Sequence, residues 1–269
     1  MRRPSAERSE ALGRHKKMPP EAAPRLTGPY FFADPASIFE NRLTLSGADA
    51  RHLAVRRARP GEIVHVGDGS GTIFEARLES IEENEVTASI LSARQVPAPS
   101  PGVTVLQGLA KGTKVDWAVE KLVELGVDRV AVFTSGRSVP VWDRAKSEAA
   151  AKRWQRIALA AAKQSRRAWL PEVLGPLKTQ GAVQLVKRAP MALVAAPEAE
   201  LGLREAIEGE PPAEVLLVVG PEGGLADHEV DVFVDAGATA VDLGSQILRT
   251  ETAGLALAAA VMFHFGRFG

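Results

Sequence analysis

The chain contains no cysteine, and this absence excludes several kinds of chemistry. A protein without thiols has no disulfides, no cysteine-ligated zinc, no iron–sulfur cluster and no thiolate nucleophile. The histidines are also scattered without the spacing of metal ligands, so we expect each to be a surface or packing residue and expect no metal. They are His15, His52, His65, His228 and His264.

Long apolar runs and net charge are missing as well. No stretch approaches the roughly 18 apolar residues of a membrane span, and the start of the chain lacks the apolar core of a secretory signal. We therefore expect a cytoplasmic protein with no membrane partner. The 33 Lys and Arg residues balance the 33 Asp and Glu residues, so the formal charge of +0 argues neither for nor against a nucleic-acid partner.

Charge is nevertheless strongly segregated along the chain. Residues 137–167 carry nine Lys and Arg against two acids, a net charge of +7, whereas residues 195–235 carry eleven acids against one arginine, a net charge of −10. A basic stripe suits contacts with RNA phosphates, with Trp142, Trp154 or Trp169 as stacking surfaces. The alternative is a solvated helix face that covers core tryptophans.

Turn signals and periodicity divide the 269 residues into a tail and two predicted domains. We predict that residues 1–24, with a net charge of +3, form a flexible basic tail. Residues 25–96 contain short segments with two-residue alternation, which predicts a small antiparallel β-barrel or sandwich. The proline-rich stretch 97–101 is the predicted boundary, and residues 102–269 form the second domain.

In the second domain, apolar strands alternate with helices. Strands are predicted at VTVLQGLA, RVAVFTS, MALVAAP, EVLLVVG and TAVDLG, and helices at KVDWAVEKLVELGV and at about residues 143–165, 227–236 and 250–265. This alternation predicts an α/β fold with a mostly parallel sheet that helices cover on both faces. Ligands of such folds bind beyond the carboxyl ends of the strands, which directs attention to the loops after Val219 and Leu243.

The first of these loops is Gly220-Pro221-Glu222-Gly223-Gly224. Its glycines let the backbone turn and let a ligand approach the main chain, while amides near a helix start can donate hydrogen bonds. A tight turn without a ligand explains the spacing equally well. The lysine followed by serine or threonine of a Walker loop is missing, so a nucleoside triphosphate is not expected.

The second loop ends in Arg249-Thr250-Glu251-Thr252, directly before an apolar helix. These polar side chains either form one wall of a ligand pocket or serve the helix itself, with Thr250 or Thr252 as the cap and Glu251 beside the positive end of the helix dipole. If the two strands are neighbours, both loops build a single pocket.

Four motifs in order, KGTKVDWAVEKLVELGVDRV, AAKQSRR, GPEGG and LGSQILRTETA, resemble the SPOUT-class ribosomal RNA methyltransferases that methylate N3 of a uridine in 16S RNA. The resemblance extends from about Arg25 to the C-terminus, and RHLAVRRARPGEIVHVGDGSGTIFEA looks like the PUA-like amino-terminal barrel of that family. It implies a C-terminal SPOUT domain with a trefoil knot, S-adenosylmethionine as cofactor, and a homodimer with the site near the interface. The implied partner is 16S ribosomal RNA within the 30S subunit.

Motif matching also implies which residues form the site. Arg249 would stabilise charge on the uridine oxygens, and Glu251 would either accept the N3 proton or position Arg249. The implied cofactor-binding residues are Val194, Ala195, Ala196, Gly220, Glu222, Gly223, Gly224, Leu243, Gly244, Ile247 and Leu248. The basic clusters add RNA-binding candidates at Arg51, Arg56, Arg57, Arg59, Arg137, Gln164, Arg166 and Arg167.

The sequence departs from the family pattern at two places. Gly136 stands where similar sequences have the glutamate of Ser-Glu-Arg-Ser, and Lys163 stands where they have that of Glu-Gln-Ser. Both changes remove a carboxylate. Arginines near the RNA would then need another acidic partner, for which Asp128 and Glu251 are the candidates.

The absence of cysteine also bears on the reaction. Methylation of C5 of a pyrimidine ordinarily needs a thiolate that adds at C6, whereas transfer to nitrogen or to a ribose hydroxyl needs no covalent adduct. The chain is therefore not expected to methylate C5, and the resemblance implies methylation of uridine N3. Two alternatives stay open, a SPOUT methyltransferase that acts on another RNA or on a ribose 2′-hydroxyl, and a noncatalytic RNA-binding protein that keeps the scaffold.

Overall fold

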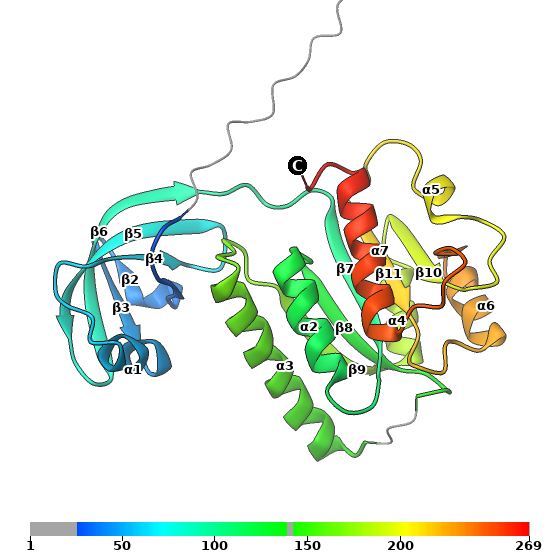
Figure 1. Cartoon of the computed structure of the whole chain (residues 1–269), viewed down its shortest axis with the longest axis horizontal. Coiled ribbons are helices and arrows are strands. Elements are labelled where there is room, and N and C mark those ends of the chain that lie inside the picture. Colours follow the sequence, from blue (N-terminus) through cyan, green and yellow to red (C-terminus); the bar gives the residue numbers. More distant parts are fainter. Residues whose placement is uncertain (1–25, 139–141, 269) are drawn as a thin grey trace, which may run out of the picture.

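The computed structural model describes residues 26–138 and 142–268, so the predicted tail lies outside the described residues. Two six-stranded sheets, one in each part of the chain, organise the fold (Figure 1). Residues 96–101 connect them. Within the described ranges, no helix is long and apolar enough to cross a membrane.

The amino-terminal sheet is curled, and its strand pairs are antiparallel except for the parallel pair of β1 and β4. The strand order is β1-β4-β5-β6-β3-β2. Alternate residues such as Val64, Val66 and Val86 point into a core that α1 closes with Leu53, as expected for half-buried strands. The elements are β1 (Tyr30–Phe32), η1 (Pro35–Ser37), β2 (Ile38–Phe39), β3 (Arg42–Ser46), α1 (Ala48–Val55), β4 (Ile63–Gly67), β5 (Thr72–Ile81) and β6 (Glu85–Gln95).

The carboxy-terminal sheet is parallel in all its described pairs, in the order β12-β10-β11-β7-β8-β9. Its strands bury side chains on both faces, which explains their near-continuous apolar runs. The strands are β7 (Gly102–Gly108), β8 (Arg129–Thr134), β9 (Glu172–Lys178), β10 (Met191–Ala195), β11 (Glu214–Val219) and β12 (Thr239–Val241).

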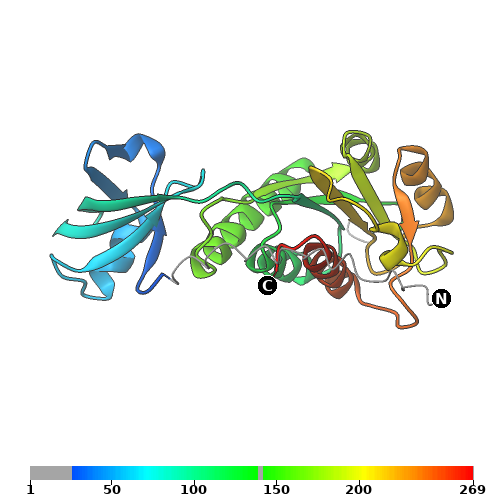
Figure 2. The ribbon, with the colours of Figure 1, turned by 90° about the horizontal axis from the view of Figure 1, so that it is seen from above.

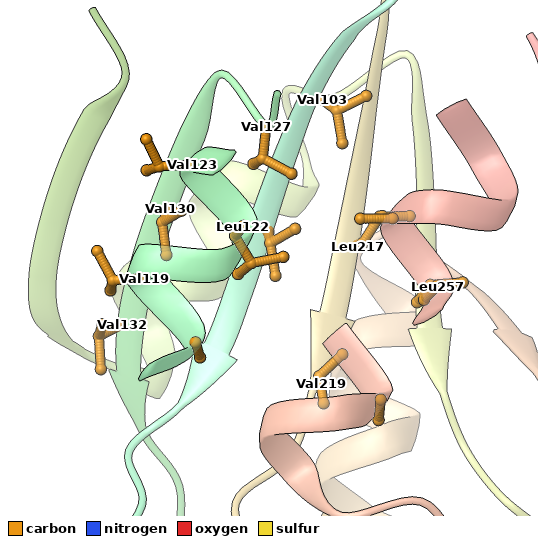
Figure 3. Close-up of a cluster of buried hydrophobic side chains, with 14 of the residues drawn as sticks. Val103, Val119, Leu122, Val123, Val127, Val130, Val132, Leu217, Val219 and Leu257 are labelled. Atoms are coloured by element: carbon orange, nitrogen blue, oxygen red, sulfur yellow. The ribbon is translucent and has the colours of Figure 1, made fainter. Parts of the chain in front are cut away.

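Helices cover both faces of this sheet (Figure 2). On one face, α2, α3 and α7 form the larger core together with strand residues such as Val103 and Leu217. Figure 3 shows the part of this core that α2 and α7 contribute. On the other face, α4 and α6 pack on Leu106 and Phe133. The helices are α2 (Lys114–Leu125), α3 (Arg144–Gln164), α4 (Thr179–Val186), α5 (Leu203–Ala206), α6 (Asp227–Asp235) and α7 (Thr250–His264).

The last strand and the last helix lie at different parts of the sheet, so the chain crosses over between them. β12 lies at an edge of the sheet beside β10, but α7 packs on β7 and β11 in the middle. The connecting residues 242–249 therefore pass back across the carboxyl ends of the strands. This return brings the predicted second loop to the same edge as the first.

The segment between α3 and β9 docks onto the barrel. The Tyr30 hydroxyl donates to the carbonyl oxygen of Arg167 at 2.7 Å, and Trp169 donates from Nε1 to the carbonyl oxygen that follows β6, at 3.0 Å. Lys163, near the end of α3, lies with Nζ 2.7 and 2.8 Å from the two carboxylate oxygens of Asp49 in α1. These contacts fix the barrel against the end of α3.

Candidate functional site

A cavity of about 970 Å³ opens beyond the carboxyl ends of β10, β11 and β12. The two predicted loops both line it, and Gly223 and Gly244 share its wall. The strands that carry the loops are not direct neighbours, because β10 lies between β11 and β12. The end of β10, at Ala195 and Ala196, completes the wall between the loops.

The bend Gly220–Gly224 has no room for side chains at its first residue. A Cβ on Gly220 would lie 2.9 Å from the carbonyl carbon of Gly224, and one on Gly108, the last residue of β7, would collide with the backbone of Pro221. Gly224 has a φ of +69°, in the left-handed region that favours glycine. The glycines thus bring the main chain of the bend to the cavity surface.

Glu222 ties this bend to the loop after β7. Its Oε1 accepts hydrogen bonds from the Lys111 amide and from the Lys114 ammonium, both at 3.0 Å. Burial by itself would raise the pKa of the Glu222 carboxyl, but these hydrogen bonds outweigh burial and lower the pKa below its ordinary value. Glu222 is therefore ionised at neutral pH, and its charge holds Lys114 at the cavity wall.

Two further side chains hold the other side of the bend. Arg137 donates from Nη1 to the carbonyl oxygens of Gly223 and of the residue two positions later, at 3.1 and 3.2 Å. The buried carboxylate of Glu229 accepts hydrogen bonds from the amides of Gly136, at 2.7 Å, and Ala226, at 2.9 Å. The carboxylate beside the Gly136 loop is thus supplied by α6.

The candidates for replacing the lost carboxylates do not lie at the cavity. Asp128 pairs with Arg167 and Arg267, but it directly precedes β8 and so lies at the amino ends of the strands, away from the cavity. Glu251 is not among the cavity-lining residues. Lys163, in place of the second glutamate, makes the ion pair with the barrel described above.

The two predicted catalytic residues are placed differently. Arg249 is exposed at the N-cap position of α7 and lines the cavity, and its guanidinium makes no hydrogen bond or ion pair with the described residues. Glu251 lies in the first turn of α7, and its Oε2 is buried with no hydrogen-bond partner among the residues described. Arg249 therefore lines the cavity, whereas Glu251 does not.

Ten of the eleven predicted cofactor-binding residues line the cavity, and Val194 is the exception because its side chain is buried in the core beneath β10. The volume lies at the upper end of the range for small-ligand sites, roughly 300–1,000 Å³. Apolar side chains such as Leu225 and Leu248 line it together with the carboxylates of Asp227 and Asp242. This wall fits S-adenosylmethionine, which combines apolar, hydroxyl and cationic groups.

The predicted RNA-binding residues divide by exposure. The exposed ones are Arg51, Arg56, Arg57, Arg59, Arg137, Gln164 and Arg166, of which Arg56 also pairs with Glu62. The Arg167 side chain is only 10% exposed, and its guanidinium donates to the carbonyl oxygens of Val123 and Val127 and to Asp128. Its donors are committed to the interior, so we replace the RNA-binding interpretation of Arg167 with a structural one.

The three candidate tryptophans are packed within the protein. Trp154 is buried and donates from Nε1 to Asp116 at 3.1 Å, and Trp142 stacks on it with ring centroids 5.9 Å apart. Trp169 packs at the junction with the barrel. These tryptophans are therefore better explained as packing residues behind the basic stripe than as surfaces on which RNA bases stack.

Sequence reasoning missed three residues: Lys114, which lines the cavity, Gln107, which donates a hydrogen bond to the cavity-lining Thr250, and Glu229, which holds Gly136. Lys114 follows β7 at the same sheet edge as the predicted loops, and that position is a usable signal. Gln107 interrupts an apolar strand, which is a second usable signal because a polar residue in a buried strand needs a partner. Glu229 is an ordinary acid in the first turn of a helix and carries no such signal.

Comparison with known proteins gives two family matches. A family model described as an RNA methyltransferase domain matches residues 97–262. A second, described as an RNA methyltransferase PUA domain, matches residues 45–91. Both parts of the chain are therefore similar to domains of RNA methyltransferases.

Individual relatives agree with these matches. Ribosomal RNA small subunit methyltransferase E of Mycobacterium tuberculosis is 39% identical over 217 residues, which cover 78% of this chain and 81% of the relative, and that of Bacillus subtilis is 30% identical over 231 residues, which cover 82% and 89%. The crystal structure of the corresponding enzyme from Neisseria gonorrhoeae, bound to S-adenosyl methionine, is 30% identical, with a TM-score of 0.80 over 90% of this chain and 99% of that one.

Proposed function

The chain belongs to the RNA methyltransferase family, and on this basis we propose that it transfers a methyl group from S-adenosylmethionine to N3 of a specific uridine in 16S ribosomal RNA. One observation carries the proposal. Two glycine-bearing bends, far apart in the sequence, line a single cavity together with the unpaired guanidinium of Arg249, within the described part of the chain.

We propose that the cofactor lies against the main chain of the two bends and the end of β10. When bound, its sulfonium supplies an electrophilic methyl group and leaves as a neutral thioether. The support is the fit of the cavity and the relative from Neisseria gonorrhoeae that was crystallised with this molecule. The proposed contacts are Ala195, Ala196, Gly220, Glu222, Gly223, Gly224, Leu243, Gly244, Ile247 and Leu248.

Transfer to N3 requires that the nitrogen lose its proton. The proton passes to solvent, and the negative charge that remains on the uracil ring is shared by the two flanking carbonyl oxygens until N3 accepts the methyl group. We propose that Arg249, whose guanidinium is permanently charged, donates hydrogen bonds to these oxygens. A donor of this kind contributes about 10²–10³-fold to the rate.

For Glu251 we favour the positioning role over that of the base. A general base must come within hydrogen-bond distance of the proton that it accepts. Glu251 does not line the cavity, and it lies two residues after Arg249 in the first turn of α7. We propose that it acts by fixing the start of this helix.

RNA contacts are proposed for the exposed basic residues of the barrel, within residues 25–96, and for the end of α3 and the loop after it, while residues 102–269 carry the methyl transfer. Cations on both sides of the junction suit an RNA backbone that crosses it. The proposed set is Arg51, Arg56, Arg57, Arg59, Gln164 and Arg166. Arg137 also donates a hydrogen bond to the bend Gly220–Gly224, which we call the cofactor bend, so it is not assigned to RNA alone.

We further propose a homodimer that acts on the 30S subunit in the cytoplasm. After its first turn, α7 is apolar on all sides up to Phe263, yet Phe263 is 72% exposed and Ile247, at the cavity rim, is 94% exposed. Apolar helices of this kind are normally covered. A second copy that covers α7 would place the cavity near the interface.

Light scattering should report a dimer for the natural chain and a monomer for Phe263→Glu, and a monomeric natural chain would contradict this proposal.

The identity of the methylated nucleoside tests the function. Unmodified 16S RNA, free or assembled into 30S subunits, is incubated with the full chain and methyl-labelled S-adenosylmethionine, digested to nucleosides and analysed by mass spectrometry. We expect label in 3-methyluridine. Label only in 2′-O-methylnucleosides would establish the alternative methyltransferase. No transfer, together with no heat of cofactor binding in calorimetry, would leave the noncatalytic RNA-binding protein.

A further inference from the structure

Two buried polar side chains lie directly behind the cofactor bend. Gln107, in β7, is 1% exposed, and Thr250, the first residue of α7, is 6% exposed. They are 143 residues apart, but Gln107 Nε2 donates to Thr250 Oγ1 at 2.8 Å. Thr250 Oγ1 in turn donates to the carbonyl oxygen of Gly220 at 2.5 Å.

The chemistry of the groups fixes the direction of this chain of hydrogen bonds. The Gln107 amide nitrogen can only donate, so the Thr250 oxygen accepts, and its one proton is left for the Gly220 carbonyl. The hydroxyl thus has no second proton for a ligand, although Thr250 and Gly220 both line the cavity. The Thr250 hydroxyl instead links β7, the cofactor bend and the start of α7.

Helix α7 has no side chain at the position where the Gln107 amide lies against it, because residue 254 is glycine. Gly254 lies inside α7, where glycine is less favourable than alanine. A Cβ at this position would lie 2.9 Å from Gln107 Oε1, an atom that is buried with no hydrogen-bond partner among the described residues. An alanine at 254 would therefore displace the amide, which explains a glycine at a helical position.

We propose that Gln107 and Thr250 are positioning residues for methyl transfer, which hold the cofactor bend and the helix start that carries Arg249 at a fixed separation. The inference rests on the proposed function, since it assigns the bend to the cofactor and Arg249 to the uridine. Small displacements between reacting groups lower the rate strongly, by about 10²-fold for 1 Å. Cofactor affinity is less sensitive, because Glu222 and Arg137 still hold the bend.

A matched set of variants separates this role from a structural one. Thr250→Val removes the hydroxyl and keeps the shape, Thr250→Ser restores the hydroxyl, and Gly254→Ala displaces Gln107 while improving helix propensity. For each full-length variant, kcat at saturating cofactor, the Kd for S-adenosylmethionine by calorimetry and Tm are measured. We expect kcat to fall at least about tenfold for Thr250→Val and Gly254→Ala, with Kd changed by less than about threefold, and Thr250→Ser to recover most of kcat.

The outcomes divide clearly. A fall in kcat that leaves Kd within about threefold and that Thr250→Ser reverses is what a merely structural role would not produce, and Gly254→Ala carries the test if Thr250→Val does not fold. A natural chain that methylates RNA, together with variants that keep its kcat, would overturn the inference alone. The same holds if Thr250→Ser is as slow as Thr250→Val. A natural chain that neither binds the cofactor nor methylates RNA would refute the proposed function, and the inference with it.

Discussion

Replacing Asp128 by asparagine should lower the free energy of unfolding more than the loss of any exposed ion pair does. Asp128 is 25% exposed and faces Arg267 at 2.6 Å and Arg167 at 3.2 Å, whose side chains are 11% and 10% exposed. Burial lowers the pKa of Arg167, and the charge of Asp128 opposes this effect. Asparagine keeps the shape but leaves two nearly buried cations without their counter-charge.

The size of the effect follows from these exposures. Removing one partner of a fully buried pair costs about 3–5 kcal/mol, and partial solvent screening at Asp128 reduces this to about 2–3 kcal/mol. For a chain of this size we expect Tm to fall by about 5–10 °C. Calorimetric melts of the full chain measure the change.

Glu148→Gln is the matched control. Its partner Arg144 is 91% exposed, so this substitution should change Tm by less than about 2 °C. If Asp128→Asn were no more destabilising than this control, the structural role given to Arg167 would be wrong. A loss of RNA affinity at unchanged Tm would return Arg167 to the RNA-binding surface.

Three further predictions concern the cavity. Gly223→Val places a branched side chain at the cavity wall, where it takes up space that the cofactor needs, so calorimetry should detect no cofactor binding. Arg249→Ala should lower kcat by about 10²–10³-fold with little change in cofactor Kd, and unchanged turnover would remove Arg249 from the mechanism. The folded pKa of Glu222 lies below its ordinary value of 4.5, so its stabilising contribution is present above that pH and is lost as the pH falls through the folded pKa. The Tm difference between the natural chain and Glu222→Gln should therefore shrink on acidification, and a constant difference would contradict the pairing with Lys114.

Periodicity predicted most of the carboxy-terminal elements because each carries its own signal. α2 shows the apolar face that the spacing indicates, and it ends at Gly126 with a φ of +108°, the left-handed cap expected there. The missed elements lack such signals. α1 is a helix of only eight residues whose apolar residues are mostly alanine, and β9 contains the Gly175-Pro176 pair that normally marks a turn.

The candidate site was predictable to the extent that it lies in loops at strand ends. Glycines and polar residues after two apolar strands indicated where a ligand would lie, and the cavity is there. The insertion of β10 between these strands depends on strand order, which no local pattern encodes. Contacts such as that of Glu229 with the Gly136 amide, or of Gln107 with Thr250, join distant segments and appear only when the chain is folded.

The docked junction between the barrel and α3 has a consequence for target choice. Hydrogen bonds from Tyr30 and Trp169, together with the pair of Lys163 and Asp49, leave the two halves little freedom to rotate. The distance from the barrel's arginines to the cavity is therefore fixed by the fold. If the proposed RNA contacts of these arginines hold, the uridine that is methylated is the one that RNA folding presents at that distance from the bound backbone.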